Sequence, residues 1–278
     1  MRSSVAHLST SSVRYLEAGS GRALVLLHAF PLSAEQWLPQ LARVPPGWRF
    51  VAPDLRGFGG AEPGPVPGGI SMDTYAGDVI ELMAHLEIPS AVVAGLSMGG
   101  YVAFAIARRA PARVAGLVLA DTRAAADTAD GRAARDRMLA IVARDGPAGV
   151  AREMLPKLLG DTTRRDQPDL VDAVQRLIEH NAPDGIAAAI RAMKDRPDST
   201  AMLSSFACPV TVICGEEDVI TTVAENETMH RAIAGSRFVR IAAAGHLSNL
   251  ENPAAFTTAL TTNVPDTPGL KTQRPTSD

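Results

Sequence analysis

Hydrophobic residues in the first half of the chain gather in short runs that alternate with longer, helix-like stretches. The run at 23–28 is continuously apolar up to His28, as expected of a strand that is buried on both faces. An alternating stretch at 12–17 suggests an early exposed strand, and three further apolar runs lie at 48–53, 91–94 and 114–119. Helical spacing marks 73–86 and 98–109. Strands that alternate with helices of about 12 residues indicate βαβ units and a mostly parallel sheet of the α/β class.

The character of the sequence changes after residue 121. The stretch 122–197 is rich in Ala, Arg, Asp, Leu and Met, carries helical spacing at 132–144 and 169–180, and contains no convincing strand. Strand patterns resume at 210–214 and 237–241 and are followed by a helix at 253–262. We therefore expect an α/β core made of 1–121 and 198–264, a helical lid at 122–197, and a flexible C-terminal tail at 265–278.

Composition excludes several classes of function. A formal net charge of -3 gives no basic face for nucleic acid. Apolar runs of roughly 18 residues, which a membrane span requires, are missing, and the first residues contain no signal-peptide core. The two cysteines, Cys208 and Cys214, fall in one apparent strand and are too far apart to pair. Two unpaired thiols predict a reducing, cytoplasmic location. The sequence gives no prediction of the oligomeric state.

The strongest local signal for chemistry is Gly95-Leu96-Ser97-Met98-Gly99. A serine on a tight turn between a strand and a helix has strained backbone angles, and flanking glycines avoid collisions that larger side chains would cause. The letters alone could occur by chance, but here a buried strand ends at Ala94 and a helix begins at Met98. This context predicts Ser97 as a nucleophile.

A serine nucleophile needs a base, and two of the six histidines are well placed for that role. His28 and His246 each follow a strand, and the loops at the carboxyl ends of the strands form the site of an open α/β sheet. His246 lies in a loop that can reach Ser97, so we predict it as the base. His28 is the alternative base, although we expect it to brace its own loop by hydrogen bonding.

A histidine base needs a carboxylate to hold its tautomer. Asp218 follows the strand at 210–214 and completes the order Ser, Asp, His along the chain. Glu216 and Glu217 are close neighbours nearer the strand end, and Asp121 is the main rival, at the end of another strand. We predict Asp218 as the acid and keep Asp121 as the alternative.

Two backbone N–H groups are candidates for stabilising an oxyanion. One is that of Met98, directly after the nucleophile. The other is that of Phe30, because Pro31, next in the loop after the first buried strand, cannot donate. We further predict His28, Val219 and Leu247 as substrate-pocket residues.

Taken together, these motifs resemble the α/β-hydrolase superfamily from about residue 13 to 260. The matching segments are His28-Ala29-Phe30-Pro31, Asp54-Leu55-Arg56-Gly57-Phe58-Gly59, Gly95-Leu96-Ser97-Met98-Gly99-Gly100, Gly215-Glu216-Glu217-Asp218 and Gly245-His246. The resemblance implies an eight-stranded sheet, a helical lid between the sixth and seventh strands, and no cofactor or metal. The chain departs from the family pattern at Ala29, where glycine is usual, and at Ala61, where serine is common.

Within the superfamily, the stretch His246-Leu247-Ser248-Asn249 is similar to the 3-oxoadipate enol-lactonase and small carboxylesterase branch. We therefore expect cleavage of a small ester or lactone through a covalent acyl-enzyme. Other possibilities are a strict enol-lactonase, a cofactor-free perhydrolase or haloperoxidase, and a signalling receptor of the same fold.

The predicted lid offers both apolar and cationic side chains. Most of the apolar ones are expected to hold the lid helices against the body, and the remainder to roof the acyl pocket: Met138, Met154, Leu155, Leu158, Leu159, Ile178, Ile190 and Met193. Arg132, Arg135 and Arg164 are candidate partners for a substrate that carries a carboxylate.

Overall fold

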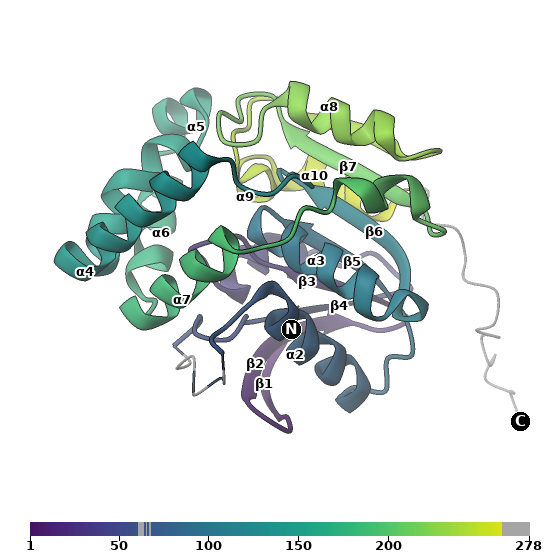
Figure 1. Ribbon diagram of the computed structural model, residues 1–278. Coiled ribbons are helices and arrows are strands. Elements are labelled where there is room, and N and C mark those ends of the chain that lie inside the picture. The colour runs from purple at the N-terminus through teal and green to yellow at the C-terminus, as the bar shows by residue number, and fades with distance from the viewer. Residues whose placement is uncertain (61–63, 65, 67, 263–278) are drawn as a thin grey trace, which may run out of the picture.

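A single mixed sheet forms the centre of the protein. The computed structural model describes residues 1–60, 64, 66 and 68–262, so the predicted tail at 265–278 lies outside the described residues. Within these, eight strands follow the order β1-β2-β4-β3-β5-β6-β7-β8 (Figure 1). Their bounds are β1 (Arg2–His7), β2 (Ser12–Gly19), β3 (Arg22–Leu27), β4 (Trp48–Pro53), β5 (Ala91–Leu96), β6 (Val114–Ala120), β7 (Val210–Gly215) and β8 (Arg237–Ile241).

Strand direction follows from how the strands are connected. The pairs β1–β2 and β2–β4 are antiparallel, and every other neighbouring pair is parallel. Parallel strands need a crossover between them, and the predicted βαβ units supply it. The eight-stranded, mostly parallel sheet confirms the predicted α/β class.

Helices cover both faces of this sheet. Helix α3 (Met98–Arg109) packs on β5 and β6, and α2 (Met72–His85) packs on α3, in front of the sheet in Figure 1. Helix α8 (Val223–Ala232) contacts β7 and β8. Behind the sheet, α10 (Pro253–Thr261) contacts the same two strands and α1 (Leu38–Leu41). All six residues of β5 are consequently buried, which explains its continuous apolar run.

Two details of the strand pattern differ from expectation. The stretch at 12–17 was expected to be an exposed strand, but most of β2 is buried, including Tyr15 and Leu16. Because β1 pairs with its outer side, β2 is an interior strand, and β1 forms that edge of the sheet. Cys208 precedes β7 rather than lying in the same strand as Cys214, and both cysteines are free, as predicted.

A layer of helices separates β6 from β7 along the chain and lies to one side of the sheet (Figure 1). It consists of α4 (Ala129–Leu158), α5 (Asp161–Asp166), α6 (Pro168–Glu179) and α7 (Pro183–Lys194), and the short helix η3 (Thr200–Ser205) leads back to β7. Helix α4 bends at Gly146, which has a φ of 63° inside the helix. Helix α7 was not predicted, because Pro183 marks its first turn rather than a break.

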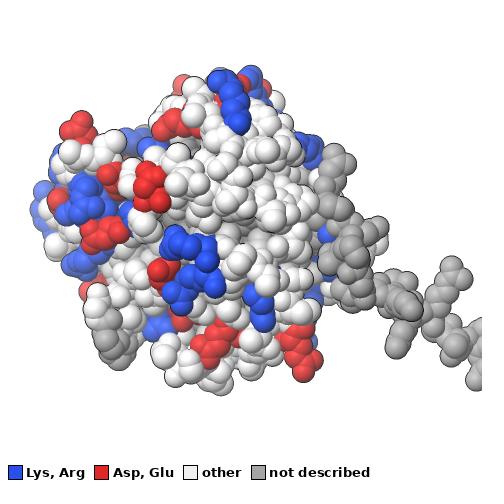
Figure 2. Space-filling view, turned by 45° about the vertical axis from the view of Figure 1, so that its right-hand side comes forward, with Lys and Arg blue, Asp and Glu red and all other residues white. Residues whose placement is uncertain are grey.

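The remaining short helices are η1 (Ala34–Trp37), η2 (Pro111–Arg113) and α9 (Ser248–Glu251). On the face that Figure 2 displays, cationic and anionic side chains are interspersed among uncharged surface. Among the described residues, no helix is both long and apolar enough to cross a bilayer.

Helix α7 approaches the core through Gly185. A Cβ atom on Gly185 would lie 1.9 Å from the carbonyl oxygen of Gly57, in the loop after β4. Gly77 of α2 is the opposite case, because a Cβ there would meet no atom within 4 Å. The absence of a side chain at Gly185 is therefore needed for this contact between the helical layer and the core.

These two glycines predict stability changes of opposite sign. Gly77→Ala should raise the free energy of unfolding by about 0.5–1 kcal/mol, because alanine loses less backbone freedom in a helix. Gly185→Ala should lower it by roughly 1–3 kcal/mol, because the new methyl group overlaps backbone that has little room to move. Urea denaturation measures both. Changes of the same sign in the two variants would contradict the contact between α7 and the loop after β4.

Candidate active site

Ser97 occupies the turn between β5 and α3, with a φ of 54° and a ψ of -112°. A serine seldom adopts these angles, so its surroundings must hold it there. Its N–H donates to the carbonyl oxygen of Ala120 at 2.9 Å, and its own carbonyl oxygen accepts from the Thr122 hydroxyl at 2.8 Å. Both partners lie at the end of β6, so the neighbouring strand fixes the turn.

The glycines of the motif allow close backbone contacts. A Cβ on Gly95 would lie 2.2 Å from the carbonyl oxygen of Gly99, and one on Gly99 would lie 2.1 Å from that of Leu27. Helix α3 could not begin this close to β3 with larger residues. The spacing read from the sequence therefore has a steric cause at both glycines.

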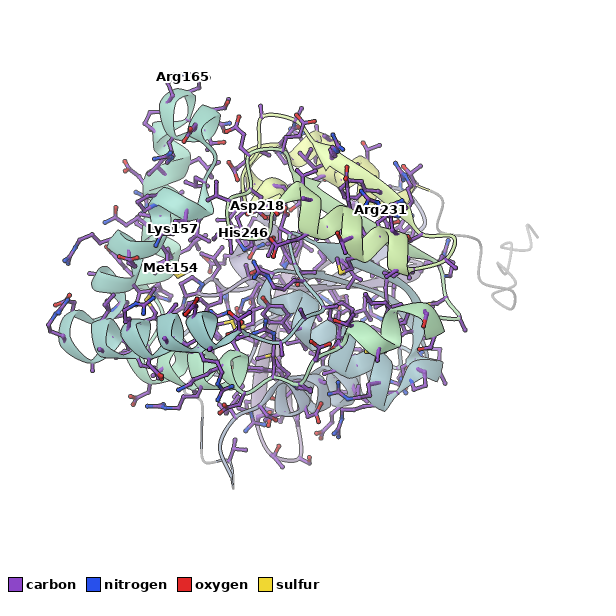
Figure 3. The ribbon with its side chains drawn as sticks, turned by 45° about the horizontal axis from the view of Figure 1, so that its top comes forward. Met154, Lys157, Arg165, Asp218, Arg231 and His246 are labelled. Carbon is purple, nitrogen blue, oxygen red and sulfur yellow. The ribbon has the colours of Figure 1, made fainter. Side chains whose placement is uncertain are left out.

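The structure brings Ser97, His246 and Asp218 into one hydrogen-bonded line. His246 Nε2 lies 2.8 Å from Ser97 Oγ, and His246 Nδ1 lies 2.8 Å from Asp218 Oδ2. His246 and Asp218 are buried on the loops after β8 and β7, where Figure 3 labels them near one another. Asp218 accepts the Nδ1 proton in this arrangement, which leaves Nε2 as the acceptor for the Ser97 hydroxyl.

Asp218 is held by more than His246. Its Oδ1 accepts from the N–H groups of Ile220 at 2.7 Å and Thr221 at 3.0 Å, and its Oδ2 accepts from the Thr221 hydroxyl at 2.6 Å. Burial alone would raise the pKa of Asp218, but His246 and these donors lower it below its usual value. Thr221 was not identified from the sequence; an Asp followed by two loop N–H donors is the turn signal that could have suggested it.

The two candidate oxyanion donors lie on either side of Ser97. Met98 is the first residue of α3, so its N–H has no acceptor within the helix. Phe30 lies in the loop after β3, and its peptide bond to Pro31 is cis. No protein acceptor is assigned to the N–H of Phe30 among the described residues, which leaves both groups available to a ligand.

His28 braces the same loop and does not contact Ser97. Its Nδ1 donates to the carbonyl oxygen of Ala29 at 2.9 Å, and its Nε2 accepts from the N–H of Leu55 at 3.0 Å. Desolvation in this buried position lowers the pKa of His28, so the ring is neutral. With both nitrogens occupied, His28 is not the base, and the expected bracing role is confirmed.

Asp121, the rival acid, lies behind Asp218 and does not contact His246. Its Oδ1 accepts from the N–H of Gly215 at 2.7 Å, and its Oδ2 accepts from the Ser248 hydroxyl. Complete burial, together with the charge of Asp218, raises the pKa of Asp121 well above its usual value. Burial therefore favours the neutral form of Asp121, and Asp218 carries the charge that faces His246.

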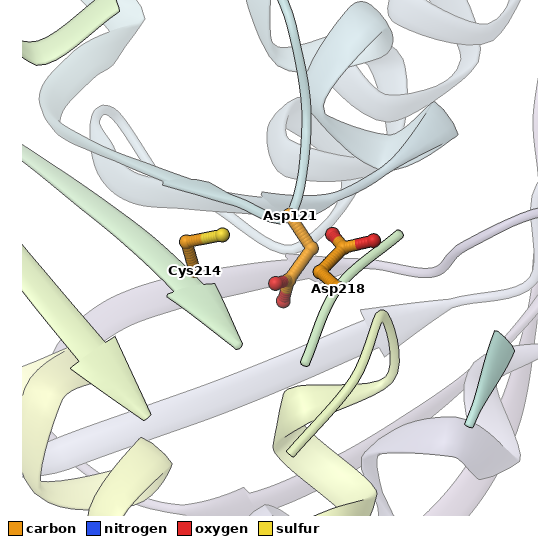
Figure 4. Close-up of side chains that lie close together, drawn as sticks. All are labelled: Asp121, Cys214 and Asp218. Atoms are coloured by element: carbon orange, nitrogen blue, oxygen red, sulfur yellow. The ribbon is translucent and has the colours of Figure 1, made fainter. Parts of the chain in front are cut away.

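Cys214 completes a compact group with these two carboxyls (Figure 4). Ligand atoms of the three side chains lie within 4.8 Å of one another, as a metal site would require. However, the Cys214 thiol donates to the carbonyl oxygens of Gly215 and Thr221, and burial raises its pKa. A protonated thiol and a carboxylate already bonded to His246 do not fit a metal ion.

The other predicted pocket residues differ in exposure. Val219, next to Asp218, is 69% exposed, whereas Leu247 is fully buried. The N–H of Leu247 lies 3.1 Å from the carbonyl oxygen of Leu158 at the end of α4. Contact of Val219, Leu247 or His28 with substrate stays a prediction.

Two glutamates join the helical layer to the loops that carry Asp218 and His246. Glu217 accepts from the N–H of Thr162 at 2.9 Å, and Glu251 accepts from the N–H of Gly160 at 2.8 Å. Glu251 also accepts from the N–H of Leu247, and burial raises its pKa. The sequence motifs did not single out these two glutamates as links, because each bonds to residues distant along the chain.

The three arginines proposed for a charged substrate all have carboxylate partners. Arg132 bonds to Asp195 at 2.9 Å, Arg135 bonds to Asp127 at 3.0 Å, and Arg164 bonds to Asp161. The predicted apolar residues of the layer divide into two groups. Leu158, Leu159, Ile178, Ile190 and Met193 are buried, whereas Met138, Met154 and Leu155 are half-buried.

Comparisons with known proteins agree with this geometry. A sequence model of the alpha/beta hydrolase fold matches residues 22–253. The chain is 29% identical over 238 residues to 3-oxoadipate enol-lactonase 2 of Acinetobacter baylyi, which covers 86% of each protein.

Solved structures give the same picture. A thermophilic esterase from Thermogutta terrifontis superposes with a TM-score of 0.87 at 37% identity, covering 94% of this chain and 97% of that one. The enol-lactonase from Burkholderia xenovorans superposes with a TM-score of 0.84 at 26% identity, covering 92% and 98% of the two chains. These two likenesses extend over almost the whole of both folds.

The protonated state of Asp121 predicts a particular dependence of stability on pH. In the unfolded chain this group ionises near a pKa of about 3.9, whereas in the folded chain it keeps its proton to higher pH. The stability it contributes is therefore present at low pH and is lost as pH rises through the raised folded pKa. Asp121→Asn removes this dependence, so wild type should lose stability relative to the variant as pH rises above about 4.

Asp127→Asn is a control of opposite sign. Burial raises the pKa of Asp127, but Arg135 and Arg196 lower it by more, so the net pKa lies below the usual value. Wild type should therefore lose stability relative to this variant only as pH falls below about 4. Urea denaturation across the pH range measures both differences. A gain of wild-type stability over Asp121→Asn with rising pH would show that Asp121 is ionised in the folded protein.

Proposed function

Because this chain belongs to the alpha/beta-hydrolase fold family, we propose that it cleaves a small carboxylic ester or lactone with Ser97 as nucleophile, His246 as base and Asp218 as acid. Its relatives include esterases and enol-lactonases, and the chain is a carboxylic ester hydrolase. The observation that carries the proposal is the continuous hydrogen-bonded line from Ser97 Oγ through His246 to Asp218.

The first half of the reaction is transfer of the acyl group to Ser97. As Ser97 Oγ attacks the carbonyl carbon, its proton passes to His246 Nε2, and the imidazolium is stabilised by Asp218. His246 then gives the proton to the leaving alkoxide, and the ester bond breaks. In a lactone the leaving alkoxide is part of the same molecule as the acyl group, so ring opening releases no second molecule.

The second half reverses the roles of the same groups. A water molecule gives its proton to His246 and attacks the acyl-enzyme, and Ser97 leaves with the proton that His246 returns. In both halves the tetrahedral oxyanion accepts hydrogen bonds from the N–H groups of Met98 and Phe30. Loss of one such donor typically costs roughly 3–4 kcal/mol of transition-state stabilisation.

The helical layer at 122–197 acts as the lid over this site. Its attachment through Glu217 and Glu251 supports that role, because Glu217 immediately precedes the acid and Glu251 also accepts from the N–H of the residue after the base. The half-buried Met138, Met154 and Leu155 are its candidates for contact with the acyl group. Phe30, Val219 and Leu247 border the acyl site in this proposal.

The charged side chains of the helical layer favour an uncharged substrate. Each of Arg132, Arg135 and Arg164 already has a carboxylate partner, so a substrate carboxylate would have to displace one. The relatives named enol-lactonases favour a second candidate, hydrolysis of an enol-lactone that bears a carboxylate. The two candidates differ in the charge of the preferred acyl group and share the same chemistry.

Ser97→Ala tests the nucleophile. Hydrolysis of p-nitrophenyl acetate should fall by more than about 1,000-fold, and labelling by a fluorophosphonate probe should disappear, because no acyl-enzyme can form. Ser205→Ala is the matched control, since Ser205 is an exposed serine of η3 and should keep both activities. A Ser97→Ala protein that retained the wild-type rate would refute the assignment.

A substrate panel tests the acyl group. We expect kcat/KM for p-nitrophenyl acetate and butyrate to exceed that for 3-oxoadipate enol-lactone by about 10-fold or more, because an unpaired carboxylate is costly to bury. Acyl-homoserine lactones, which carry no carboxylate, serve as uncharged lactones in the same panel. Preference for the enol-lactone by a similar factor would instead support the second candidate. Peroxide-dependent bromination that outpaces ester hydrolysis would favour a perhydrolase.

A further inference from the structure

Three amide side chains form a closed cluster beneath the loop after β3. Gln36 lies in η1, Gln40 in α1 and Asn249 in α9, and all three are fully buried. Asn249 lies three residues after His246, more than 200 positions along the chain from the two glutamines. The cluster therefore joins two segments that are distant in sequence and adjacent in the site.

Every polar atom of the three side chains has a partner. Gln36 Nε2 donates to Asn249 Oδ1 at 3.1 Å, and Asn249 Nδ2 donates to the Gln36 carbonyl oxygen at 3.0 Å and to Gln40 Oε1 at 3.1 Å. Gln40 Nε2 donates to the Asn249 carbonyl oxygen at 3.0 Å. A buried network in which every side-chain nitrogen and oxygen is bonded favours one geometry, because a displacement leaves a polar group unpaired.

One bond extends from the cluster to the candidate oxyanion loop. Gln36 Oε1 accepts from the N–H of Ala29 at 2.8 Å, and Ala29 immediately precedes Phe30. At the other end, Asn249 belongs to the segment that begins with His246. The path from the base to the candidate oxyanion donor is thus Asn249, Gln36 and Ala29.

We propose that Gln36 is a positioning residue that, through Asn249, sets the backbone N–H of Phe30 relative to His246. Gln36 does not contact the reacting atoms; by accepting from the Ala29 N–H it holds the His28–Ala29 peptide, which directly precedes the peptide whose Phe30 N–H is offered to the oxyanion. The inference rests on the proposed function for its catalytic consequence, but the structural link stands on the hydrogen bonds alone. An oxyanion donor misplaced by a fraction of an ångström loses much of its effect.

Gln40 provides a matched control, because the same substitution removes two side-chain hydrogen bonds at each site. Gln36→Met removes the partners of the Ala29 N–H and Asn249 Oδ1. Gln40→Met removes the partner of the Asn249 carbonyl oxygen and one of the two acceptors of Asn249 Nδ2, which keeps its bond to the Gln36 carbonyl oxygen. Methionine has a similar volume and no amide, so both variants perturb the cluster, but only the first releases Ala29.

We expect Gln36→Met to lower kcat for p-nitrophenyl acetate by about 10- to 100-fold with KM changed less than about threefold, because the missing contact acts on the transition state. The Ki of a trifluoromethyl ketone, which forms an oxyanion on Ser97, should rise by a similar factor. Gln40→Met should keep kcat and Ki within about threefold of wild type. Equal losses in both variants, or wild-type kcat and Ki in Gln36→Met, would overturn the proposal.

Gln36→Glu keeps the test decisive if Gln36→Met folds poorly. A glutamate retains an acceptor for the Ala29 N–H while altering the bond to Asn249, so it should keep more of kcat than Gln36→Met does. A glutamate variant as impaired as the methionine variant would argue against a role through Ala29.

Amide hydrogen exchange separates this proposal from the proposed function. Exchange at Ala29, whose N–H loses its acceptor, should accelerate at least 10-fold in Gln36→Met and change little in Gln40→Met, whatever chemistry Ser97 performs. Unchanged exchange in Gln36→Met would refute the structural link. A fully active Ser97→Ala protein would refute the triad and leave this measurement valid.

Discussion

The candidate site depends on how closely helix α3 approaches strand β3. The backbone of Gly99 lies against the carbonyl oxygen of Leu27, at a distance that leaves no room for a side chain. This contact places the N-terminus of α3, with the N–H of Met98, beside the loop that carries Phe30. Because β3 and β5 are neighbouring parallel strands, the loops that follow them both begin at the carboxyl end of the sheet. Ser97 lies between them, so one steric constraint brings the nucleophile and both candidate oxyanion donors together.

Much of this arrangement could be predicted from the sequence, because its signals are local. The buried strands are recognisable as apolar runs in the sequence, and Ser97, Asp218 and His246 each follow a strand in the order that the fold requires. What could not be predicted depends on contacts between distant segments. The edge strand β1 carries no apolar run because most of it is exposed, and Glu217 and Glu251 gain their partners in the helical layer only when distant segments meet. Gln36 and Asn249 look like ordinary polar residues until the fold buries them together.

Protonation divides the acidic groups near His246 into two kinds. Asp218, with three donors besides the histidine, has a lowered pKa and stays ionised, whereas the pKa of the buried Asp121 is raised, which favours its neutral form. Two carboxylates this close would repel one another if both were charged. Asp121 instead bonds to Gly215, the last residue of β7, and to Ser248, the first residue of α9. A single negative charge therefore faces the imidazole, where it can stabilise the imidazolium that forms when Ser97 gives up its proton.

Several links between the helical layer and the segments below it end on main-chain atoms of the layer. Gly160 and Thr162 are held through their N–H groups, and Leu158 through its carbonyl oxygen. Asn181 is an exception, because its side-chain amide donates to the Pro31 carbonyl oxygen and accepts from the N–H of Gly59. Side chains of the layer that make no such bond can change without disturbing these links. Such a division lets evolution vary the acyl group that is recognised while the chemistry stays intact, and esterases and lactonases can then diverge from one ancestral scaffold.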